Sequence, residues 1–379
     1  MIIISLRKRE RKMNILLLSC NTGQGHNSAA YAVRDEILRR GDSCEMQNAL
    51  LFLHEVYDKV ISDGHTFFYK RFPKLFGIGY RFEETHTPNF IRAQMKLGVK
   101  KFKAYMAENN FDAIISTHVF GSLLVNEYKK QTGDNILSTF ISTDFTCHPG
   151  APESEADIYF TPHPLVTPEF LEDGISEDKI RPFGIPVAKQ FVDRVDKLKA
   201  REELGFRSDQ KIILVACGSM GCGPIVKTAS FISMKMPKAL VVVACGHNER
   251  LLSRLARLDR ANILPLPFTK KMHLYLSAAD VFISKAGGLS TSEAIYSGTP
   301  LLYIDAVPGC ETRNIEFMIG NNFATAADSP YDAANKVGGI LNNPQKSLDK
   351  ITDCLSGMAP NPAEAICNEV ERILKAGNK

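Results

Sequence analysis

One stretch of the chain, residues 280–314 (DVFISKAGGLSTSEAIYSGTPLLYIDAVPGCETRN), constrains the fold more than any other. Residues 281–284 are apolar or small, which is typical of a short buried strand. The pair Gly287–Gly288 follows, and then a helical segment that ends at Gly298, where helices commonly place a left-handed glycine. Residues 301–304 have the character of a second buried strand. The stretch therefore predicts a strand–helix–strand unit of a parallel sheet.

The start of this helix has the composition of an anion site. Glycines let the backbone approach a ligand closely, and the first N–H groups of a helix favour a phosphate. Ser290 and Glu293 have the S-x-x-E spacing of a capping box, in which each side chain accepts from a backbone N–H. Two interpretations stay open from these residues alone. The segment is a phosphate site, or it is an ordinary turn in which Glu293 is only the capping partner.

Length and composition indicate a two-domain globular protein. The chain has 379 residues, of which 44% are hydrophobic and 23% are charged. A net charge of +4 is too small to indicate a nucleic-acid binder, and no apolar run reaches the roughly 18–20 residues of a spanning helix. The nine cysteines are scattered without a C-x-x-C pair, which favours reduced thiols in a cytosolic protein. We interpret residues 1–12 (MIIISLRKRERK) as a disordered basic extension or an upstream start codon, with a membrane contact as the alternative.

A second glycine-rich turn, residues 21–28 (NTGQGHNS), follows a buried strand at residues 14–19 and precedes a helix that ends at Gly41. The turn lacks the complete G-x-G-x-x-G pattern, so a nicotinamide cofactor is not indicated. His26 stands in this turn. Histidine suits general-base catalysis because its pKa lies near neutrality, although a single loop histidine is more often a solvated or capping side chain.

Three polar side chains follow two later strands. His118 comes after a strand at residues 111–116, and Asp144 and His148 come at and after the end of a strand at residues 137–143. Open α/β sheets bind ligands at the carboxyl ends of their strands, so we expect these side chains to face one cleft. They would assist a base or contact a substrate; a metal held by the two histidines and Asp144 is the alternative.

The second half of the chain repeats this architecture. Strands are predicted at residues 211–216, 239–244 and 263–267, with a short helix at 201–206 before them. A terminal helix is predicted from Asn361 to about residue 376, because Asn361 is a good N-cap and proline and glutamate follow in the first turn.

The central motif resembles the donor-nucleotide motif of the GT-B glycosyltransferases. It consists of A-G-G-L-S-T-S-E-A-I at 286–295, S-G-T-P at 297–300 and P-G-C-E-T-R-N at 308–314. The resemblance is closest to the monogalactosyl- and diglucosyl-diacylglycerol synthases, similar to glycosyltransferase family 28, and more distant to the lipid II-forming N-acetylglucosaminyltransferase. It implies that Gly287, Gly288, Leu289 and Ser290 hold the UDP diphosphate, Glu293 the ribose, and Glu311 and Asn314 the hexose. Cys310 replaces the glutamine usual in these enzymes, which leaves the donor sugar open.

The same resemblance extends along the rest of the chain. T-G-x-G-H at 22–26 matches the first loop of these enzymes, and T-D-x-x-C-H-P at 143–149 is close to the plant galactolipid synthases. It implies that His26 is the base that deprotonates the acceptor hydroxyl, that Asp144 assists it, and that Gly25 contacts the nucleotide sugar. The other implied residues are His118 and His148 on the acceptor side, Gly218, Ser219, Met220 and Gly221 at the donor phosphates, and Phe268, Thr269 and Met272 at the uracil.

Residues 59–107 contain ten Lys or Arg against three Asp or Glu, interleaved with aromatic residues. A basic, aromatic-rich surface suits an anionic membrane interface. The alternative is a helical subdomain with its aromatic residues inside and its lysines in solvent. RNA binding is not indicated, because no RNP or KH signature accompanies the charges.

We therefore predict the α/β GT-B fold, in which two doubly wound Rossmann-like domains face each other across a cleft. The segment G-I-P-V at 184–187 resembles the linker of these enzymes. Residues 13–185 would form the acceptor and membrane-side domain, 186–345 the UDP-sugar domain, and 346–379 a helical segment that packs back on the first domain.

The predicted function is inverting transfer of a hexose from UDP-glucose or UDP-galactose to a lipid hydroxyl, with diacylglycerol as the expected acceptor. We expect no essential metal or other cofactor and no nucleic-acid partner. The expected location is the cytoplasm, with peripheral attachment to the inner face of the cell membrane. Two alternatives stay open: a glycosyltransferase of the same fold with an undecaprenyl-linked or small-molecule acceptor, and a non-catalytic UDP-sugar sensor.

Overall fold

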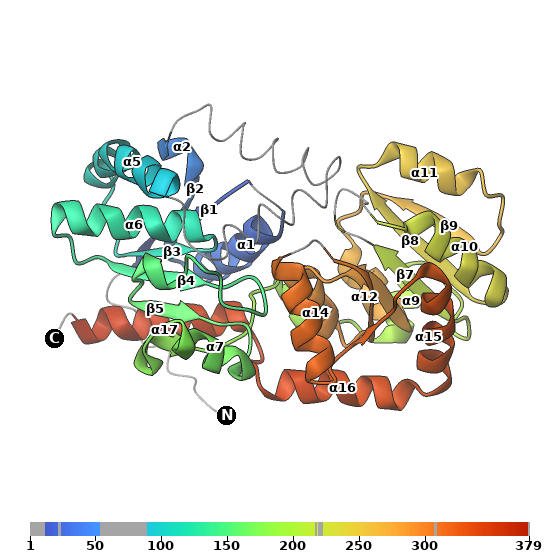
Figure 1. Cartoon of the computed structure of the whole chain (residues 1–379). Helices are drawn as coiled ribbons and strands as arrows, with labels where there is room; N and C mark the ends of the chain where they lie inside the picture. Colours follow the sequence, from blue (N-terminus) through green and yellow to red (C-terminus); the bar gives the residue numbers. More distant parts are fainter. Residues whose placement is uncertain are drawn as a thin grey trace, which may run out of the picture.

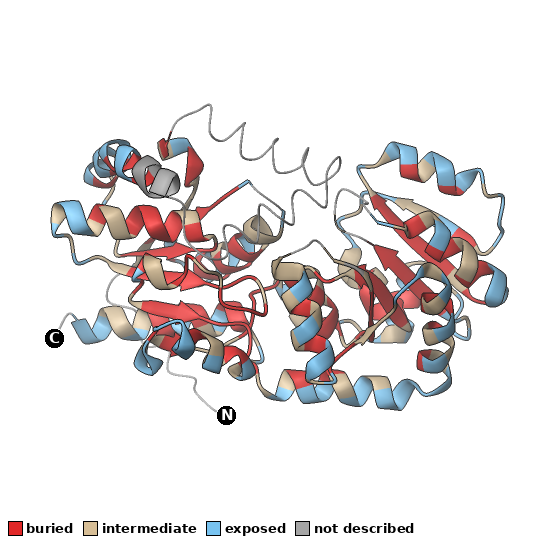
Figure 2. Ribbon diagram, viewed as in Figure 1, coloured by how far each residue is buried: buried red, intermediate tan, exposed pale blue. Residues whose placement is uncertain are grey.

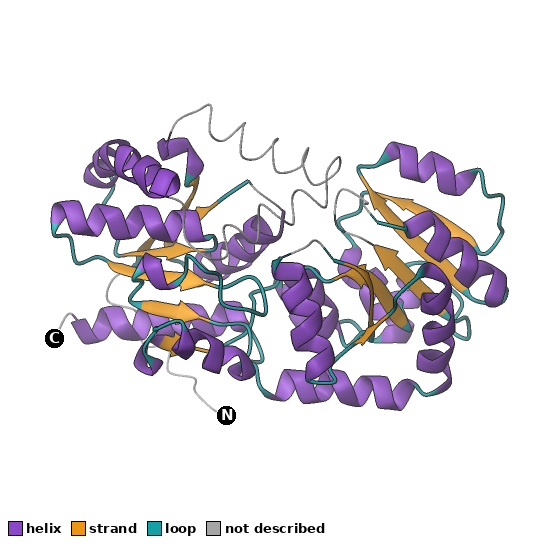
Figure 3. Cartoon of the chain, viewed as in Figure 1, coloured by secondary structure: helices purple, strands orange, loops and turns teal. Residues whose placement is uncertain are grey.

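The computed structural model describes residues 12–21, 24–53, 89–216, 218, 223–306 and 309–377. These residues form two parallel six-stranded sheets with helices packed around them (Figures 1 and 3). The strand order is β2-β1-β3-β4-β5-β6 in the first sheet and β12-β11-β10-β7-β8-β9 in the second. The prediction of two doubly wound α/β domains is confirmed.

The inner strands of the first sheet are short runs of mostly buried residues, as parallel strands covered by helices require, whereas the edge strand β2 is only partly buried. Its strands are β1 (Asn14–Ser19), β2 (Ser43–Asn48), β3 (Ala113–Ser116), β4 (Leu137–Ile141), β5 (Ile158–Phe160) and β6 (Ile180–Arg181). The α-helices of this half are α1 (Gln24–Arg39), α2 (Leu50–Leu53), α5 (Asn89–Glu108), α6 (Val119–Thr132) and α7 (Thr167–Glu172). Its 3-10 turns are η1 (Pro152–Ser154), η2 (Pro164–Val166) and η3 (Glu177–Lys179).

The second sheet repeats the pattern of parallel strands connected by helices. Its strands are β7 (Ile212–Ala216), β8 (Leu240–Gly246), β9 (Ile263–Pro267), β10 (Val281–Lys285), β11 (Leu301–Asp305) and β12 (Thr325–Ala326). The helices up to the central motif are α8 (Lys189–Val192), α9 (Lys197–Glu203), α10 (Ile225–Lys235), α11 (Glu249–Ala256) and α12 (Met272–Ala278). The later helices are α13 (Gly288–Ser297), α14 (Cys310–Gly320), α15 (Pro330–Asn342), α16 (Pro344–Ser356) and α17 (Pro362–Gly377).

Each sheet has one point at which the strand order reverses direction. In the first sheet it lies between β1 and β3, and in the second between β7 and β10. Consecutive crossovers diverge at such a point, so the loops after the two strands leave space for a ligand at the carboxyl ends. The turn that precedes His26 follows β1, and the glycine pair at 287–288 follows β10. Both glycine-rich turns thus lie at switch points.

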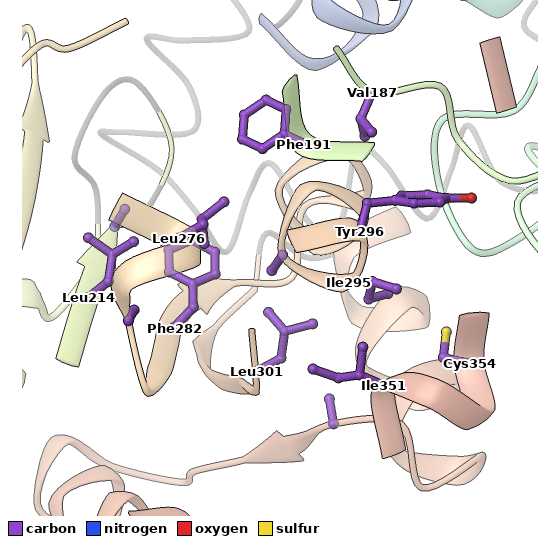
Figure 4. Packing of buried hydrophobic residues seen from close by; sticks show 14 of the residues in the cluster. Val187, Phe191, Leu214, Leu276, Phe282, Ile295, Tyr296, Leu301, Ile351 and Cys354 are labelled. Atoms are coloured by element: carbon purple, nitrogen blue, oxygen red, sulfur yellow. The ribbon is translucent and has the colours of Figure 1, made fainter. Parts of the chain in front are cut away.

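The core lies along both sheets, where Figure 2 shows the buried residues concentrated. Figure 4 shows the apolar cluster around α13, in which Ile295 and Tyr296 belong to the same core as Leu301 of β11 and Ile351 and Cys354 of α16. This packing anchors the body of α13, so the position of its amino end is set by the core of the second domain.

The C-terminal helix α17 packs on α1 of the first domain after crossing from the second (Figure 1). Arg40 donates to the carbonyl oxygen of Glu364 at 2.9 Å, and Arg181 donates to Glu369 at 2.6 Å. Tyr296 of α13 also donates to the carbonyl oxygen of Ala359 in the connection to α17, at 2.8 Å. The two halves of the chain are therefore tied together on the side of α17 as well as through the linker.

Several element boundaries differ from the prediction for local reasons. The strand expected at 137–143 ends at residue 141, because the Ser142 hydroxyl donates to the carbonyl oxygens of Asp144 and Thr146 and turns the chain. The helix expected at 201–206 is α9, which begins earlier because Asp196 caps it. Residues 1–11 and most of the basic, aromatic region 59–107 lie outside the described residues; α5 is its described part. Among the helices of the described ranges, none combines the length and the hydropathy needed to cross a bilayer.

Candidate functional site

The amino end of α13 carries no side-chain cap. Its N-cap residue is Gly287, and Gly288 begins the helix. The predicted capping box is therefore wrong: Ser290 lies inside the first turn, and the hydroxyl of Ser292 donates to the carbonyl oxygen of Gly288 at 3.0 Å. The amino end of α13 lies at the switch point, and no side chain caps it. A phosphate bound there can therefore accept hydrogen bonds from the first-turn N–H groups.

Glu293 consequently has no capping role. Burial raises the pKa of its carboxyl to about 8, and the structure gives it no hydrogen bond or ion pair with another of the described residues. A largely desolvated carboxyl on a half-buried residue without a protein partner is costly for the fold unless a ligand satisfies it. This favours the implied contact with the ribose hydroxyls, which stays a prediction.

The turn after β7 lies beside the turn after β10. Gly218 has φ of +69°, and a Cβ at this position would lie 3.1 Å from Cε of Lys285, the last residue of β10. The Lys285 ammonium forms an ion pair with Glu311 in the first turn of α14. The structure therefore brings Gly218 and Glu311 to one place through a lysine that the motif analysis did not single out. Three residues implied together with Gly218 lie outside the described part: Ser219, Met220 and Gly221.

The segment predicted to meet the uracil follows β9. Phe268 is exposed and stacks on His247, with ring centroids 4.3 Å apart and an angle of 16° between the planes. The hydroxyl of Thr269 accepts from the N–H of Lys271 at 3.0 Å, and Met272 begins α12. His247 follows β8, the neighbouring strand, so the aromatic pair stands at the carboxyl edge of the sheet.

His26 lies in the first turn of α1, at the switch point of the first sheet. Its Nδ1 is 3.0 Å from the carbonyl oxygen of Thr117 and 2.9 Å from the hydroxyl oxygen of Thr143. A carbonyl only accepts, so Nδ1 carries the proton and Nε2 holds the free electron pair. Burial lowers the pKa of His26, although the charge of Asp144 raises it. The imidazole is therefore neutral near pH 7, and Nε2 is the atom that can take up a proton.

The other two histidines have the opposite tautomer when neutral. Nδ1 of His118 accepts from the N–H of Phe120 at 3.2 Å as the cap of α6, and Nδ1 of His148 accepts from the N–H of Gly150 at 3.1 Å. Burial lowers the pKa of His148 to about 4. The His118 ring meets His26 edge-on, with centroids 4.6 Å apart. Of these three histidines, His26 is the one that presents a basic nitrogen.

Asn314 joins the two domains. Its Oδ1 accepts from the N–H of Phe145 at 2.6 Å, and its Nδ2 donates to Asp144 Oδ1 and to the carbonyl oxygen of Ala286, each at 2.8 Å. The side chain is fully buried, and beside it the Phe145 ring stacks on Phe317 of α14. The second domain thus orients Asp144 of the first. The implied contact of Asn314 with the hexose stays a prediction, and its amide already serves these three protein groups.

The two domains touch where the base and the donor helix meet. A Cβ on Gly288 would lie 2.0 Å from the carbonyl oxygen of Thr143, and a Cβ on Gly25 would lie 3.7 Å from the Cβ of Leu289. The amino ends of α1 and α13 are therefore neighbours, and the glycine at the start of α13 is required by the facing domain as well as by any ligand.

Metal binding finds no support in the described residues. Within those ranges no group of three His, Cys, Asp or Glu side chains is arranged to hold an ion. For the alternative site of His118, Asp144 and His148, the Nδ1 atoms of both histidines already accept backbone hydrogens.

The residues that sequence reasoning missed are of two kinds. Lys285 could have been found, because a lysine that ends a strand two residues before a glycine pair lies at the same edge of the sheet as the glycines. The carbonyl oxygen of Thr117 and the hydroxyl oxygen of Thr143 orient His26. These contacts join residues far apart in the chain, so no short sequence motif predicts them.

Two protein-family models match the chain. The monogalactosyldiacylglycerol (MGDG) synthase model matches residues 26–187, and the glycosyltransferase family 28 C-terminal domain model matches residues 212–306. A processive diacylglycerol beta-glucosyltransferase of Bacillus licheniformis is 26% identical over 368 residues, which are 94% of either chain. A probable chloroplastic monogalactosyldiacylglycerol synthase 2 of Oryza sativa subsp. indica is 28% identical over 97% of this chain and 82% of its own.

Solved structures share the fold at low sequence identity. MurG of Acinetobacter baumannii superposes with a TM-score of 0.62 at 14% identity, over 95% of this chain and 99% of its own. The glycotransferase of kitacinnamycin gives a TM-score of 0.63 at 14% identity, over 96% and 99% of the two chains. With both family models in sequence order on two facing α/β domains, this chain belongs to the GT-B glycosyltransferases, in the branch of the monogalactosyl- and diglucosyl-diacylglycerol synthases.

Proposed function

We propose that the protein transfers a hexose from a UDP-sugar to the hydroxyl group of diacylglycerol, with inversion at the anomeric carbon. Its Bacillus relative is named as a diacylglycerol glucosyltransferase and matches along 94% of its length. The observation that carries the proposal is the free Nε2 of His26, located where α1 of one domain meets α13 of the other. A base and a phosphate-binding helix end are the two groups that such a transfer needs.

In the proposed step the acceptor oxygen attacks the anomeric carbon from the face opposite the diphosphate. The bond from that carbon to the β-phosphate oxygen breaks, and its electron pair leaves with UDP. The hydroxyl proton passes to Nε2 of His26, and the nearby charge of Asp144, which raises the pKa of His26, stabilises the imidazolium. The amino end of α13 stabilises the charge that develops on UDP. The step as proposed requires no metal ion.

The proposed acceptor side includes a membrane contact through α5. The exposed face of this helix carries Leu97, whose side chain is 68% exposed, and a set of basic residues: Lys96, Lys100, Lys101 and Lys103. Each lysine near an anionic bilayer surface contributes about 1 kcal/mol of attraction. Exposed apolar side chains add contact with the lipid at such interfaces. This favours peripheral attachment at the inner face of the cell membrane.

The test is UDP release from UDP-glucose and from UDP-galactose, each with and without diacylglycerol in anionic liposomes. We expect release that depends on the lipid and that prefers one sugar, which also answers the question raised by Cys310. UDP binding without release in the presence of any acceptor would instead favour the non-catalytic sensor. Release only with undecaprenyl-linked or small-molecule acceptors would keep the enzyme and overturn the acceptor.

His26→Ala tests the assigned base. The variant should lose most turnover and keep the wild-type affinity for UDP, because the hydrogen-bond partners of His26, Thr117 and Thr143, belong to the first domain. His118→Asn is the matched control: asparagine retains the acceptor that caps α6, so this variant should lose far less turnover. Equal loss of turnover and UDP affinity in His26→Ala would make His26 a structural residue.

A further inference from the structure

A shielded ion pair lies on the donor side of the site. The ammonium of Lys285, at the end of β10, pairs with the carboxylate of Glu311 in the first turn of α14. The two side chains are only 20% and 13% exposed, so both charges are largely removed from water. Desolvation offsets most of the attraction in such a pair, so the pair adds little to the free energy of unfolding.

The surroundings of this pair have the geometry of a phosphate site. The Cε of Lys285 lies 3.1 Å from the position that a Cβ on Gly218 would take, and Oε1 of Glu311 lies 3.6 Å from the corresponding position at Gly287. The glycines belong to the turns after β7 and β10, the two strands at the switch point. The N-cap residue of α14, Gly309, makes no side-chain cap bond either. The ammonium is thus placed among backbone segments that a bulky anion can approach.

We propose that Lys285 is an exchangeable phosphate ligand. The pair with Glu311 opens when the nucleotide binds, the ammonium moves to the diphosphate, and the Glu311 carboxylate becomes available to the hexose hydroxyls. The inference rests on the proposed function, since it assigns a residue to the donor subsite of that reaction.

Charge explains the direction of the exchange. A diphosphate carries more negative charge and more acceptor oxygens than one carboxylate, so it attracts the Lys285 ammonium more strongly than Glu311 does. Each helix end supplies only about half a unit of positive charge, whereas Lys285 supplies a full unit against the charge that develops on the leaving UDP. Once the ammonium has moved away, hydrogen bonds from sugar hydroxyls stabilise the Glu311 carboxylate in this shielded site.

The experiment is calorimetric titration of the full chain with UDP, uridine and UDP-hexose. Glu311→Gln should bind UDP more tightly than the wild type, because the carboxylate no longer competes for Lys285, and should lose the advantage of UDP-hexose over UDP. Lys285→Met combined with Glu311→Gln should bind UDP roughly 10- to 100-fold more weakly than Glu311→Gln alone, with unchanged uridine affinity. The double variant leaves no unpaired charge, so its fold is not strained by an isolated carboxylate.

Lys129→Met is the matched control. Lys129 pairs with Asp157 at 2.7 Å and is also 20% exposed, but it lies on α6 of the other domain, so its loss should leave UDP affinity unchanged. The proposal is overturned if the double variant binds UDP as Glu311→Gln does, if uridine affinity falls in parallel, or if Glu311→Gln weakens UDP binding. A wild-type protein that binds no UDP would overturn the proposed function itself, which is a separate outcome.

Discussion

Replacing Asn314 by alanine removes the hydrogen bonds that join the loop after β4 to the turn after β10. The backbone N–H of Phe145 and the carbonyl oxygen of Ala286 are buried, and each loses its partner. A buried polar group without a partner costs about 1–3 kcal/mol, whereas the partly exposed Asp144 can bond to water instead. Since a water molecule in the vacated space recovers part of the loss, we expect about 2–4 kcal/mol of destabilisation.

The assay is urea unfolding at pH 7 followed by circular dichroism, together with turnover. Asn321→Ala is the control: it removes one bond, 2.8 Å to the carbonyl oxygen of Phe317, at the other end of the same helix. We expect a lower urea midpoint for Asn314→Ala than for the control, and lower turnover because Asp144 loses its orienting donor. Equal midpoints for the two variants would refute the assignment of Asn314 as the residue that joins the domains.

Asn314→Asp sharpens the same test through pH. The new carboxylate keeps an acceptor for Phe145 but faces Asp144 and the carbonyl oxygen of Ala286 without a donor. Burial and the like charge would raise its folded pKa above the unfolded value near 3.9, so the variant is least stable above that pH. The difference in unfolding free energy between the wild type and this variant should shrink as the pH falls. A difference that does not depend on pH would contradict the donor and acceptor roles assigned to the Asn314 amide.

Three further predictions concern the meeting point of the domains. Gly288→Ala places a Cβ 2.0 Å from a backbone oxygen of the facing domain, so it should abolish turnover and lower the free energy of unfolding by about 1–3 kcal/mol. Gly320→Ala is the control, because the space around Gly320 is open and the added methyl group should not destabilise the protein. Thermal melts compare the two variants. Glu293→Ala should weaken UDP binding by about 1–3 kcal/mol in calorimetry, and an unchanged dissociation constant would remove Glu293 from the donor site. Because burial lowers the pKa of His26 below 6.5, activity should fall only when the pH drops below that value. Asp144→Asn removes a charge that raises the pKa of His26, so the acid side of the pH–activity profile should move to lower pH. A move to higher pH would refute the interaction between Asp144 and His26.

The sequence alone determined the order and type of the elements. Strands β1 and β9 have the predicted limits, and α13 ends at Gly298 in the left-handed conformation that the glycine predicts. These features depend on runs of neighbouring residues: apolar stretches that must be buried, and glycines at helix ends. Because the glycine-rich turns follow the strands at the two switch points, the location of the candidate site could be predicted as well.

The tertiary structure decided which atoms are available for chemistry. The tautomer of His26 depends on a carbonyl oxygen 91 residues along the chain, and Asn314 reaches partners up to 170 residues away. The N-cap of α13 was predicted at Ser290, three residues after the observed Gly287, because the S-x-x-E spacing describes an isolated helix, whereas in this protein a facing domain packs on Gly288. Local sequence specifies local backbone energetics. The protonation and hydrogen-bond partners of a site depend on groups that only folding brings within a few ångströms.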